Sequence, residues 1–258
     1  MTRTFAIHSF LGVCVGLLFL ADGHILSSAP HREFMPVLRH GSGKAANWAG
    51  YVTAPDLLVP VKHSVTDVQG SWRVPTVTSS GTLDSSSAIW VGIDGDLDKT
   101  VEQIGTEQDW SAGTPVYYAW FEMFPGPAFL IMNVPIQPGD EISAEVQFVA
   151  KNKFILSITN FTQNTGFSIT KKRAAQRTSA EWIVEAPFFR RILSLADFGS
   201  VTFNGCSATM EGAEGPINSI SWHNEALTME NPLTSTILAQ PGGLIAGGTG
   251  FTVDWRHH

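Results

Sequence analysis

Short runs of β-branched and aromatic residues, separated by turn-forming residues, fill the chain from Trp48 to its C-terminus. Clusters of Pro, Gly, Asn, Asp and Ser divide these runs, which is the pattern of strands joined by turns. No segment keeps a helical period, and we expect residues 187–195 to form a loop or a single helical turn. The pattern predicts strands over residues 64–74, 88–93, 117–124, 141–150, 154–161, 180–185, 200–203 and 251–255.

Strands of this kind bury their apolar side chains only when one sheet packs face to face against another. We therefore expect an all-β fold, a two-sheet antiparallel β-sandwich, in one domain over residues 45–258. The composition agrees, because 15% of the residues are charged, 10% are aromatic, and there are 24 Gly and 14 Pro. That profile is typical of strand-and-turn proteins rather than of helical bundles or disordered chains.

The N-terminus has the pattern of a secretory signal peptide. Arg3 gives a positive start, residues 10–21 are apolar, and the small residues at 21–23 suit cleavage. The apolar run is shorter than the roughly 20 residues that a membrane-spanning helix needs. We expect residues 1–23 to be a cleaved signal peptide, which predicts a secreted protein with no stable membrane association.

Charge is divided unevenly between the first 44 residues and the rest of the chain. The net charge of −7 argues against a general nucleic-acid binder, because no basic stripe is available to neutralise phosphates. Residues 1–44 contain four basic and two acidic residues (+2), whereas residues 45–258 contain 12 basic and 21 acidic residues (−9). A basic leader before an acidic body predicts a propeptide over residues 24–44, with a disordered, solvated leader as the open alternative.

Only two cysteines occur, and Cys14 lies within the predicted signal peptide. Cys206 would then have no partner for an intrachain disulfide, so stability must come from the core. A thiol nucleophile with His223 downstream is conceivable, but we prefer the interpretation that Cys206 is a buried thiol.

Candidate chemistry gathers in two segments, residues 87–109 (SAIWVGIDGDLDKTVEQIGTEQD) and residues 181–185 (EWIVE). The first joins an apolar strand, an acidic Gly-containing turn and a second strand that carries Gln103. Because side chains alternate along a strand, Glu181 and Glu185 share one face, and Gln103 shares its face with Gly105. A carboxylate on a sheet face lined by aromatic residues is partly desolvated, which raises its pKa and makes it a usable acid or base. An exposed strand residue is the alternative for Glu185.

These two segments resemble the signature of the glutamic peptidases, the eqolisin or peptidase G1 family. Further stretches resemble the family's other strands in the same order: NWAGY at 47–51, GSWRVP at 70–75, YAWFEM at 118–123 and ADFGSV at 196–201. The resemblance implies a concanavalin-like jelly roll with the active site on its concave face. It also implies a secreted, acid-acting endopeptidase that acts on polypeptides without a metal or cofactor, and we expect a monomer.

By that resemblance, Glu185 matches the general base that takes a proton from water and returns it to the leaving amine. Gln103 matches the amide that holds the water and stabilises the oxyanion, and an amide does not titrate in acid. Trp90 and Asp94 match positions that shape the pocket and orient polar groups near the catalytic Gln. We add Glu107 and Glu122 as residues that line the pocket.

The chain also departs from the fungal members of that family. Glu107 stands where they place an Asp, and Ile104 replaces a Thr after the catalytic Gln. Fungal members carry disulfides, which this chain cannot form once its signal is removed. The missing disulfides predict a closer affinity to bacterial or archaeal relatives, whereas Ile104 and Glu107 leave Gln103 and Glu185 intact and change the residues around them.

The residues alone leave two other functions open. A jelly-roll glycoside hydrolase would pair Glu122 with Glu185, with carboxyl groups about 5–5.5 Å apart for retention or about 6.5–9.5 Å apart for inversion. A non-catalytic carbohydrate-binding sandwich would stack sugars on tryptophans, namely Trp48, Trp72, Trp90 and Trp120. Neither of them requires Gln103. The sequence contains no HExxH or Gly-x-Ser-x-Gly motif and no cysteine pair for zinc.

Overall fold

The computed structural model describes residues 18–21, 24–28, 33–82 and 84–257. The described residues form strands and one short 3₁₀ helix, η1 (Ala246–Gly248). Most of the predicted signal peptide lies outside the described residues. Its described part is the strand β1 (Leu18–Ala21), which pairs with β2 (His24–Ser28).

The first sheet carries the segments that the sequence singled out. Its strands are antiparallel to their neighbours and lie in this spatial order: β1, β2, β10 (Phe129–Ile131), β9 (Thr114–Phe124), β8 (Val101–Ser111), β7 (Asp84–Ile93), β14 (Ala180–Glu185), β5 (Trp48–Ala54) and β17 (His223–Glu230). Consecutive hairpins build β7, β8 and β9, whereas β14 reaches its place between β7 and β5 from much later in the chain.

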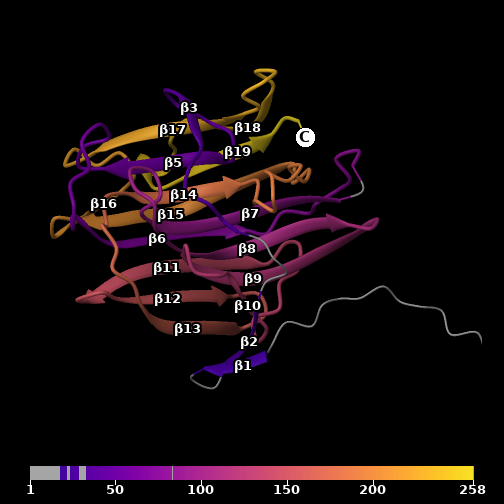
Figure 1. Ribbon diagram of the computed structural model, residues 1–258, viewed down its shortest axis with the longest axis horizontal. Helices are drawn as coiled ribbons and strands as arrows, with labels where there is room; N and C mark the ends of the chain where they lie inside the picture. The colour runs from indigo at the N-terminus through magenta and orange to yellow at the C-terminus, as the bar shows by residue number, and fades with distance from the viewer. Residues whose placement is uncertain (1–17, 22–23, 29–32, 83, 258) are drawn as a thin grey trace, which may run out of the picture.

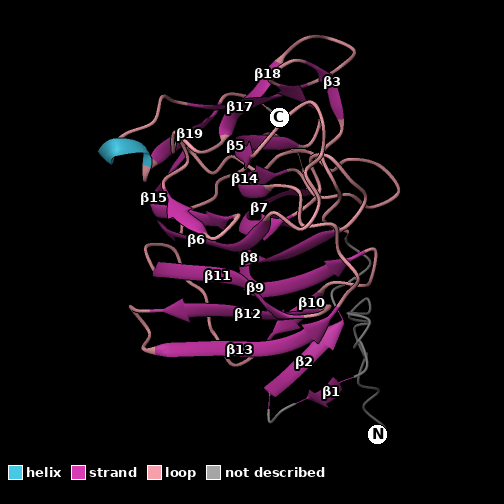
Figure 2. Ribbon diagram, turned by 90° about the vertical axis from the view of Figure 1, so that its left-hand side faces the viewer, coloured by secondary structure: helices cyan, strands magenta, loops and turns pink. Residues whose placement is uncertain are grey.

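The second sheet packs against one face of the first. Its spatial order is β13 (Thr165–Lys172), β12 (Lys153–Asn160), β11 (Glu141–Ala150), β6 (Val65–Arg73), β15 (Ser200–Met210), β19 (Phe251–Trp255), β18 (Ile237–Pro241), β17, β4 (Lys44–Ala45) and β3 (Arg39–Gly41), with β16 (Ala213–Gly215) also paired to β15. Figures 1 and 2 show β11, β12 and β13 as neighbouring arrows at one end of the molecule.

Strand β17 belongs to both sheets. Its first part, residues 223–227, pairs with β5 of the first sheet. Its last residues pair with β4 and β18 of the second sheet. The two sheets are therefore continuous along one edge of the sandwich.

The main hydrophobic core lies between the sheets, and two tryptophans bond across it. Trp72 of β6 donates from Nε1 to the Thr106 hydroxyl on β8 at 3.1 Å. Trp182 of β14 donates from Nε1 to the Gln69 carbonyl on β6 at 2.8 Å. Buried Trp and Tyr side chains usually find such partners for their polar atoms. A second apolar cluster covers the opposite face of the first sheet and includes Trp48, Trp90, Trp120, Val101 and Ile183.

The predicted two-sheet sandwich is confirmed, and so are the strands 141–150, 180–185 and 251–255. The predicted strand at 200–203 is too short, because β15 continues to Met210 past an irregularity in its pairing between Asn204 and Ser207. Residues 187–195 form a loop with isolated bridges, as one of the two alternatives predicted. Strands β13, β17 and β18 are not among the strands predicted from the sequence.

Candidate active site

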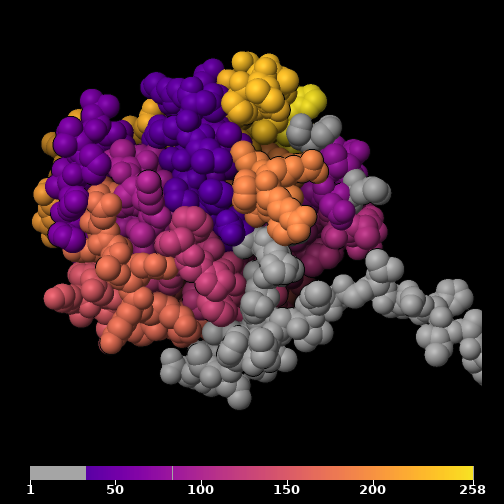
Figure 3. Space-filling model, in the orientation of Figure 1, coloured from indigo at the N-terminus to yellow at the C-terminus, as the bar shows by residue number. Residues whose placement is uncertain are grey.

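The candidate residues gather on the face of the first sheet that points away from the second. We call it the tryptophan face, because Trp48, Trp90 and Trp120 are all fully buried in the apolar cluster that covers it. Strand alternation puts Gln103 of β8 and Glu185 of β14 on this face, on either side of β7. Figure 3 shows N-terminal residues (indigo) lying over one side of the molecule, next to orange residues from later in the chain.

Gln103 is fully buried near the start of β8, directly opposite Glu122 of β9. Its Nε2 donates to Glu122 Oε2 at 2.9 Å and to the Phe34 carbonyl oxygen at 2.8 Å. Its Oε1 makes no hydrogen bond to the described residues. The amide nitrogen therefore donates to one backbone carbonyl and one carboxyl group, and the amide oxygen is left as an available acceptor.

Glu185 is the last residue of β14 and is fully buried. Its Oε2 accepts a hydrogen bond from Trp90 Nε1, and its Oε1 accepts one from the Met35 backbone N–H, each at 2.9 Å. Burial raises the pKa of Glu185 well above its ordinary value, and the N–H donors of Met35 and Trp90 oppose that rise. Both donors favour the ionised carboxylate.

One peptide group joins the two side chains. The Phe34 carbonyl oxygen and the Met35 nitrogen belong to the same amide, and they bond to Gln103 and Glu185 respectively. The Phe34 N–H also donates to Glu122 Oε2, at 3.3 Å. A backbone amide of this chain thus lies across Gln103 and Glu185, with its carbonyl on the amide donor and its nitrogen on the carboxylate.

Glycines make room for the Trp90 indole that supports Glu185. A Cβ added at Gly92 would lie 2.8 Å from the Trp90 ring. A Cβ added at Gly105 would lie 2.6 Å from the Trp90 Cβ and 2.1 Å from the Ile89 backbone oxygen. Trp48 meets Trp90 edge to face, with ring centroids 4.9 Å apart. The close packing fixes the indole whose N–H reaches Glu185.

Glu122 lies directly beside Gln103, closer to the centre of the site than a pocket-lining role requires. It is fully buried, and burial is the main cause that raises its pKa well above the ordinary value. The charge of Glu185 raises the pKa of Glu122 further. Two buried carboxyl groups that repel each other in this way do not ionise together easily.

Asp94 and Glu107 occupy two different places. The hydrogen bonds of Asp94 go to the backbone N–H groups of Arg177 and Thr178, at 2.7 and 2.6 Å, rather than to Gln103. Asp94 therefore ties the turn after β7 to the residues that lead into β14. Glu107 is fully buried on β8, four residues beyond Gln103 on the same face and opposite Ala88.

Phe34, Met35 and Asn47 lie beside Gln103 and Glu185 but were not predicted as site residues from the sequence. Asn47 accepts the Leu38 N–H at 2.8 Å and donates to the Pro36 carbonyl at 3.3 Å, so it holds the segment that follows Met35. The only sequence signal for this segment is the apolar run Phe-Met-Pro-Val inside the basic leader. That run does not show where on the sheet the segment packs.

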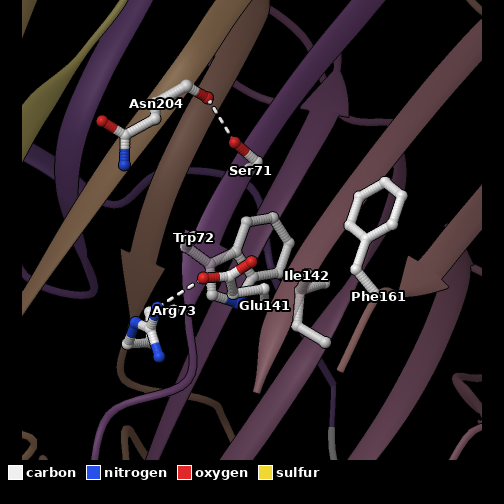
Figure 4. Close-up of a pocket in the computed structure, with 7 residues that line it drawn as sticks. All are labelled: Ser71, Trp72, Arg73, Glu141, Ile142, Phe161 and Asn204. Atoms are coloured by element: carbon white, nitrogen blue, oxygen red, sulfur yellow. Dashed lines mark hydrogen bonds and ion pairs between the residues drawn. The ribbon is translucent and has the colours of Figure 1, made fainter. Parts of the chain in front are cut away.

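Other features of the described residues lie away from this site. A pocket of about 320 Å³ lies on the second sheet. Its lining residues are drawn in Figure 4: Ser71, Trp72, Arg73, Glu141, Ile142, Phe161 and Asn204. Among the described residues, no group of three or more His, Cys, Asp or Glu side chains is arranged to hold a metal ion. No helix in the described part of the chain could cross a membrane. Cys206 is a free, buried thiol whose pKa is raised by burial.

Comparison with solved structures identifies similar folds. The crystal structure of scytalido-glutamic peptidase with a transition state analog inhibitor has a TM-score of 0.68 and covers 82% of this chain and 98% of its own, at 20% identity. The crystal structure of aspergilloglutamic peptidase from Aspergillus niger has a TM-score of 0.58 and covers 67% of this chain and 99% of its own, at 27% identity. The first, at 20% identity, establishes the fold alone, a β-sandwich jelly roll.

Sequence comparison extends the similarity to a family. Aspergillopepsin-2 of Aspergillus niger is 32% identical over 196 residues, which are 66% of this chain and 66% of that protein. Scytalidopepsin B of Scytalidium lignicola is 28% identical over 183 residues, 65% of each chain. The chain thus spans about two thirds of the length of these curated relatives. The model of the peptidase A4 family matches residues 46–240, so the chain belongs to the peptidase A4 family, the glutamic peptidases.

Proposed function

We propose that this protein is an acid-acting endopeptidase that hydrolyses polypeptides with Gln103 and Glu185 as its catalytic dyad. One observation carries the proposal: a peptide group lies between these two side chains, with its carbonyl oxygen 2.8 Å from Gln103 Nε2 and its nitrogen 2.9 Å from Glu185 Oε1. Membership of the peptidase A4 family supports the same activity.

In the proposed mechanism, ionised Glu185 takes a proton from a water molecule as the water oxygen bonds to the peptide carbonyl carbon. The carbonyl oxygen becomes an oxyanion, and Gln103 Nε2 donates a hydrogen bond to it. Glu185 then returns the proton to the amide nitrogen, and the carbon–nitrogen bond breaks. Gln103 Oε1, which has no partner among the described residues, is the acceptor that can hold the water. General acid–base help contributes about 10²–10⁴-fold and an oxyanion donor about 10²–10³-fold.

The electrostatics of the site favour a single negative charge on its two carboxyl groups. Burial raises the pKa of both carboxyl groups, and the charge of Glu185 raises the pKa of Glu122 further, so Glu122 takes up a proton before Glu185 does. Protonated Glu122 and neutral Gln103 leave a single negative charge beside the peptide group. Gln103 cannot titrate, so its donors stay in place as the pH falls.

The test is digestion of a denatured protein and of a polysaccharide panel by the purified protein between pH 3 and 8. We expect peptide-bond cleavage in acid, unaffected by a chelator, because the mechanism uses no metal. Glu185→Gln should abolish turnover, and Gln103→Ala should cost roughly 2.7–4 kcal/mol of transition-state stabilisation.

Glu181→Gln is the matched control, because Glu181 is a fully buried carboxyl group on the same strand and the same face, four residues before Glu185. It should keep most of the activity. Glu122→Gln should have a smaller effect than either dyad variant. If Glu122→Gln is inactive, Gln103→Ala is active and polysaccharide is cleaved, the glycoside hydrolase pairing of Glu122 with Glu185 replaces this proposal.

We further propose secretion after removal of residues 1–23 and a monomeric state in solution. The support for secretion is the signal-like composition of residues 1–23. The bacterial or archaeal affinity stays a prediction from the missing disulfides. Fractionation of an expressing culture and light scattering of the purified protein test the first two.

A further inference from the structure

We infer that this protein cleaves its own chain between Phe34 and Met35. The inference rests on the proposed function of Gln103 and Glu185 and adds a processing site that no motif in the sequence indicated. Its starting point is the peptide group that these two side chains hold. That group belongs to the leader of the same chain, in the position that the mechanism assigns to a substrate.

The backbone is anchored on both sides of this bond. On the N-terminal side, Glu33 and Phe188 form an antiparallel bridge, with N–H to carbonyl distances of 3.0 and 2.9 Å. On the C-terminal side, the Val37 N–H donates to the Gly95 carbonyl at 3.0 Å. Backbone pairing of this kind is a common way for a protein to hold an extended peptide regardless of its side chains. The Phe34–Met35 bond is therefore aligned by its flanks as well as by the dyad.

The Phe34 side chain packs into the apolar cluster on the tryptophan face. It is fully buried, and its ring stacks on Trp120 with a centroid distance of 3.5 Å and an interplanar angle of 10°. Ala128 and Trp48 belong to the same apolar cluster. Buried aromatic anchors of this kind dominate recognition energies. An aromatic residue immediately before the cleaved bond is thus the feature that this cluster selects.

The reaction is a simple hydrolysis. The water oxygen bonds to the Phe34 carbonyl carbon, and the bond between that carbon and the Met35 nitrogen breaks. Glu185 carries one water proton to the nitrogen, and the products are a Phe34 carboxylate and a Met35 amine. Water is the only co-reactant.

The chain on the C-terminal side of the bond stays attached to the body. Arg39 forms ion pairs with Asp96 and Glu225, at 2.6 and 2.7 Å. Lys44 pairs with Glu230 at 2.8 Å, and β4 lies in the second sheet beside β17. Cleavage therefore leaves a mature chain that begins at Met35, not at the end of the predicted propeptide, and a fragment that ends at Phe34 and stays paired to the body through β2 and the Glu33–Phe188 bridge.

The test follows the full chain after a shift from neutral to acid pH, by intact mass and N-terminal sequencing, with a denatured protein present as a second substrate. We expect a new N-terminus at Met35, first-order kinetics that do not change on dilution, and a lag in digestion of the added substrate that ends as this terminus appears. Glu185→Gln should keep the Phe34–Met35 bond intact.

Phe34→Asp should slow cleavage of its own bond by about tenfold or more and digest the added substrate without a lag, which also shows that it has folded. Phe34→Tyr should restore cleavage at the same bond. Phe161→Ala, which changes a phenylalanine that is 63% exposed, should behave like the wild type. Digestion of the added substrate with the Phe34–Met35 bond left intact would overturn this inference alone. A wild type that digests neither would overturn the proposed function as well.

Discussion

Replacing Trp90 by Phe removes one hydrogen bond to the proposed base and keeps an aromatic ring in place. Trp90 Nε1 lies 2.9 Å from Glu185 Oε2, and both side chains are fully buried. A hydrogen bond to a charged group is worth about 1.5–3 kcal/mol. One pKa unit corresponds to about 1.4 kcal/mol, so the substitution should raise the pKa of Glu185 by about one to two units.

The sign of the effect on activity follows from the role of Glu185. A base acts in its ionised form, so activity is lost as the pH falls through its pKa. Trp90→Phe should therefore move the acid limb of the kcat/KM profile to higher pH by about one to two units. Hydrolysis of a peptide substrate, followed between pH 3 and 8, measures this shift.

Trp182→Phe is the matched control, because it removes an indole hydrogen bond of 2.8 Å to the Gln69 carbonyl on the opposite face of the sheet. It should lower the melting temperature and leave the pH profile in place. An acid limb that stays unmoved in Trp90→Phe, in an enzyme that Glu185→Gln inactivates, would refute the reasoning about the base.

Three other predictions concern buried groups. Burial raises the pKa of Glu181, so the folded state holds the proton of this carboxyl group more tightly than the unfolded state does. The contribution of Glu181 to stability is therefore greatest in acid and falls as the pH rises, and Glu181→Gln should reduce the fall in melting temperature between pH 4 and 8. Gly105→Ala should destabilise the fold by about 1–3 kcal/mol, because its Cβ would lie 2.1 Å from the Ile89 oxygen, whereas Gly166→Ala, with contacts no closer than 3.6 Å, should cost less in the same denaturant titration. Cys206 should react with a thiol reagent only on unfolding, because burial raises its pKa; reaction in the native state would contradict this.

Strand periodicity was sufficient for the regular parts of the fold and failed where the pattern is interrupted. Strand β14, with alternating faces and no turn residues, matches its predicted bounds. Strand β15 continues past Gly205, which has a φ of 58° and interrupts both the alternation and the pairing. Strand β13 has few apolar residues, since it lies at the end of the second sheet and buries one side only. Local pattern alone does not distinguish such a strand from a polar loop.

Residue types and strand alternation could predict only which side chains belong to the candidate site and which face of the sheet they lie on. Alternation placed Glu185 and Gln103 on their faces, but the bond between Glu122 and Gln103 depends on the register of β8 and β9. Asp94 bonds to a segment 83 residues away along the chain. The position of Phe34 depends on backbone hydrogen bonds, which leave no trace in residue type.

Because β17 runs through both sheets, the two sheets form one continuous sheet that folds over along that strand, which we call the crease. Any opening motion would pivot about the crease, and displacement would grow with the number of strands from it. Neighbouring strands lie about 4.8 Å apart, so β14 with Glu185 lies about 10 Å from the crease, whereas β8 with Gln103 lies about 19 Å away. In such a motion the Glu185 carboxylate would move less than the Gln103 amide. Hydrogen exchange should then be faster in β8 and β9 than in β5 and β14.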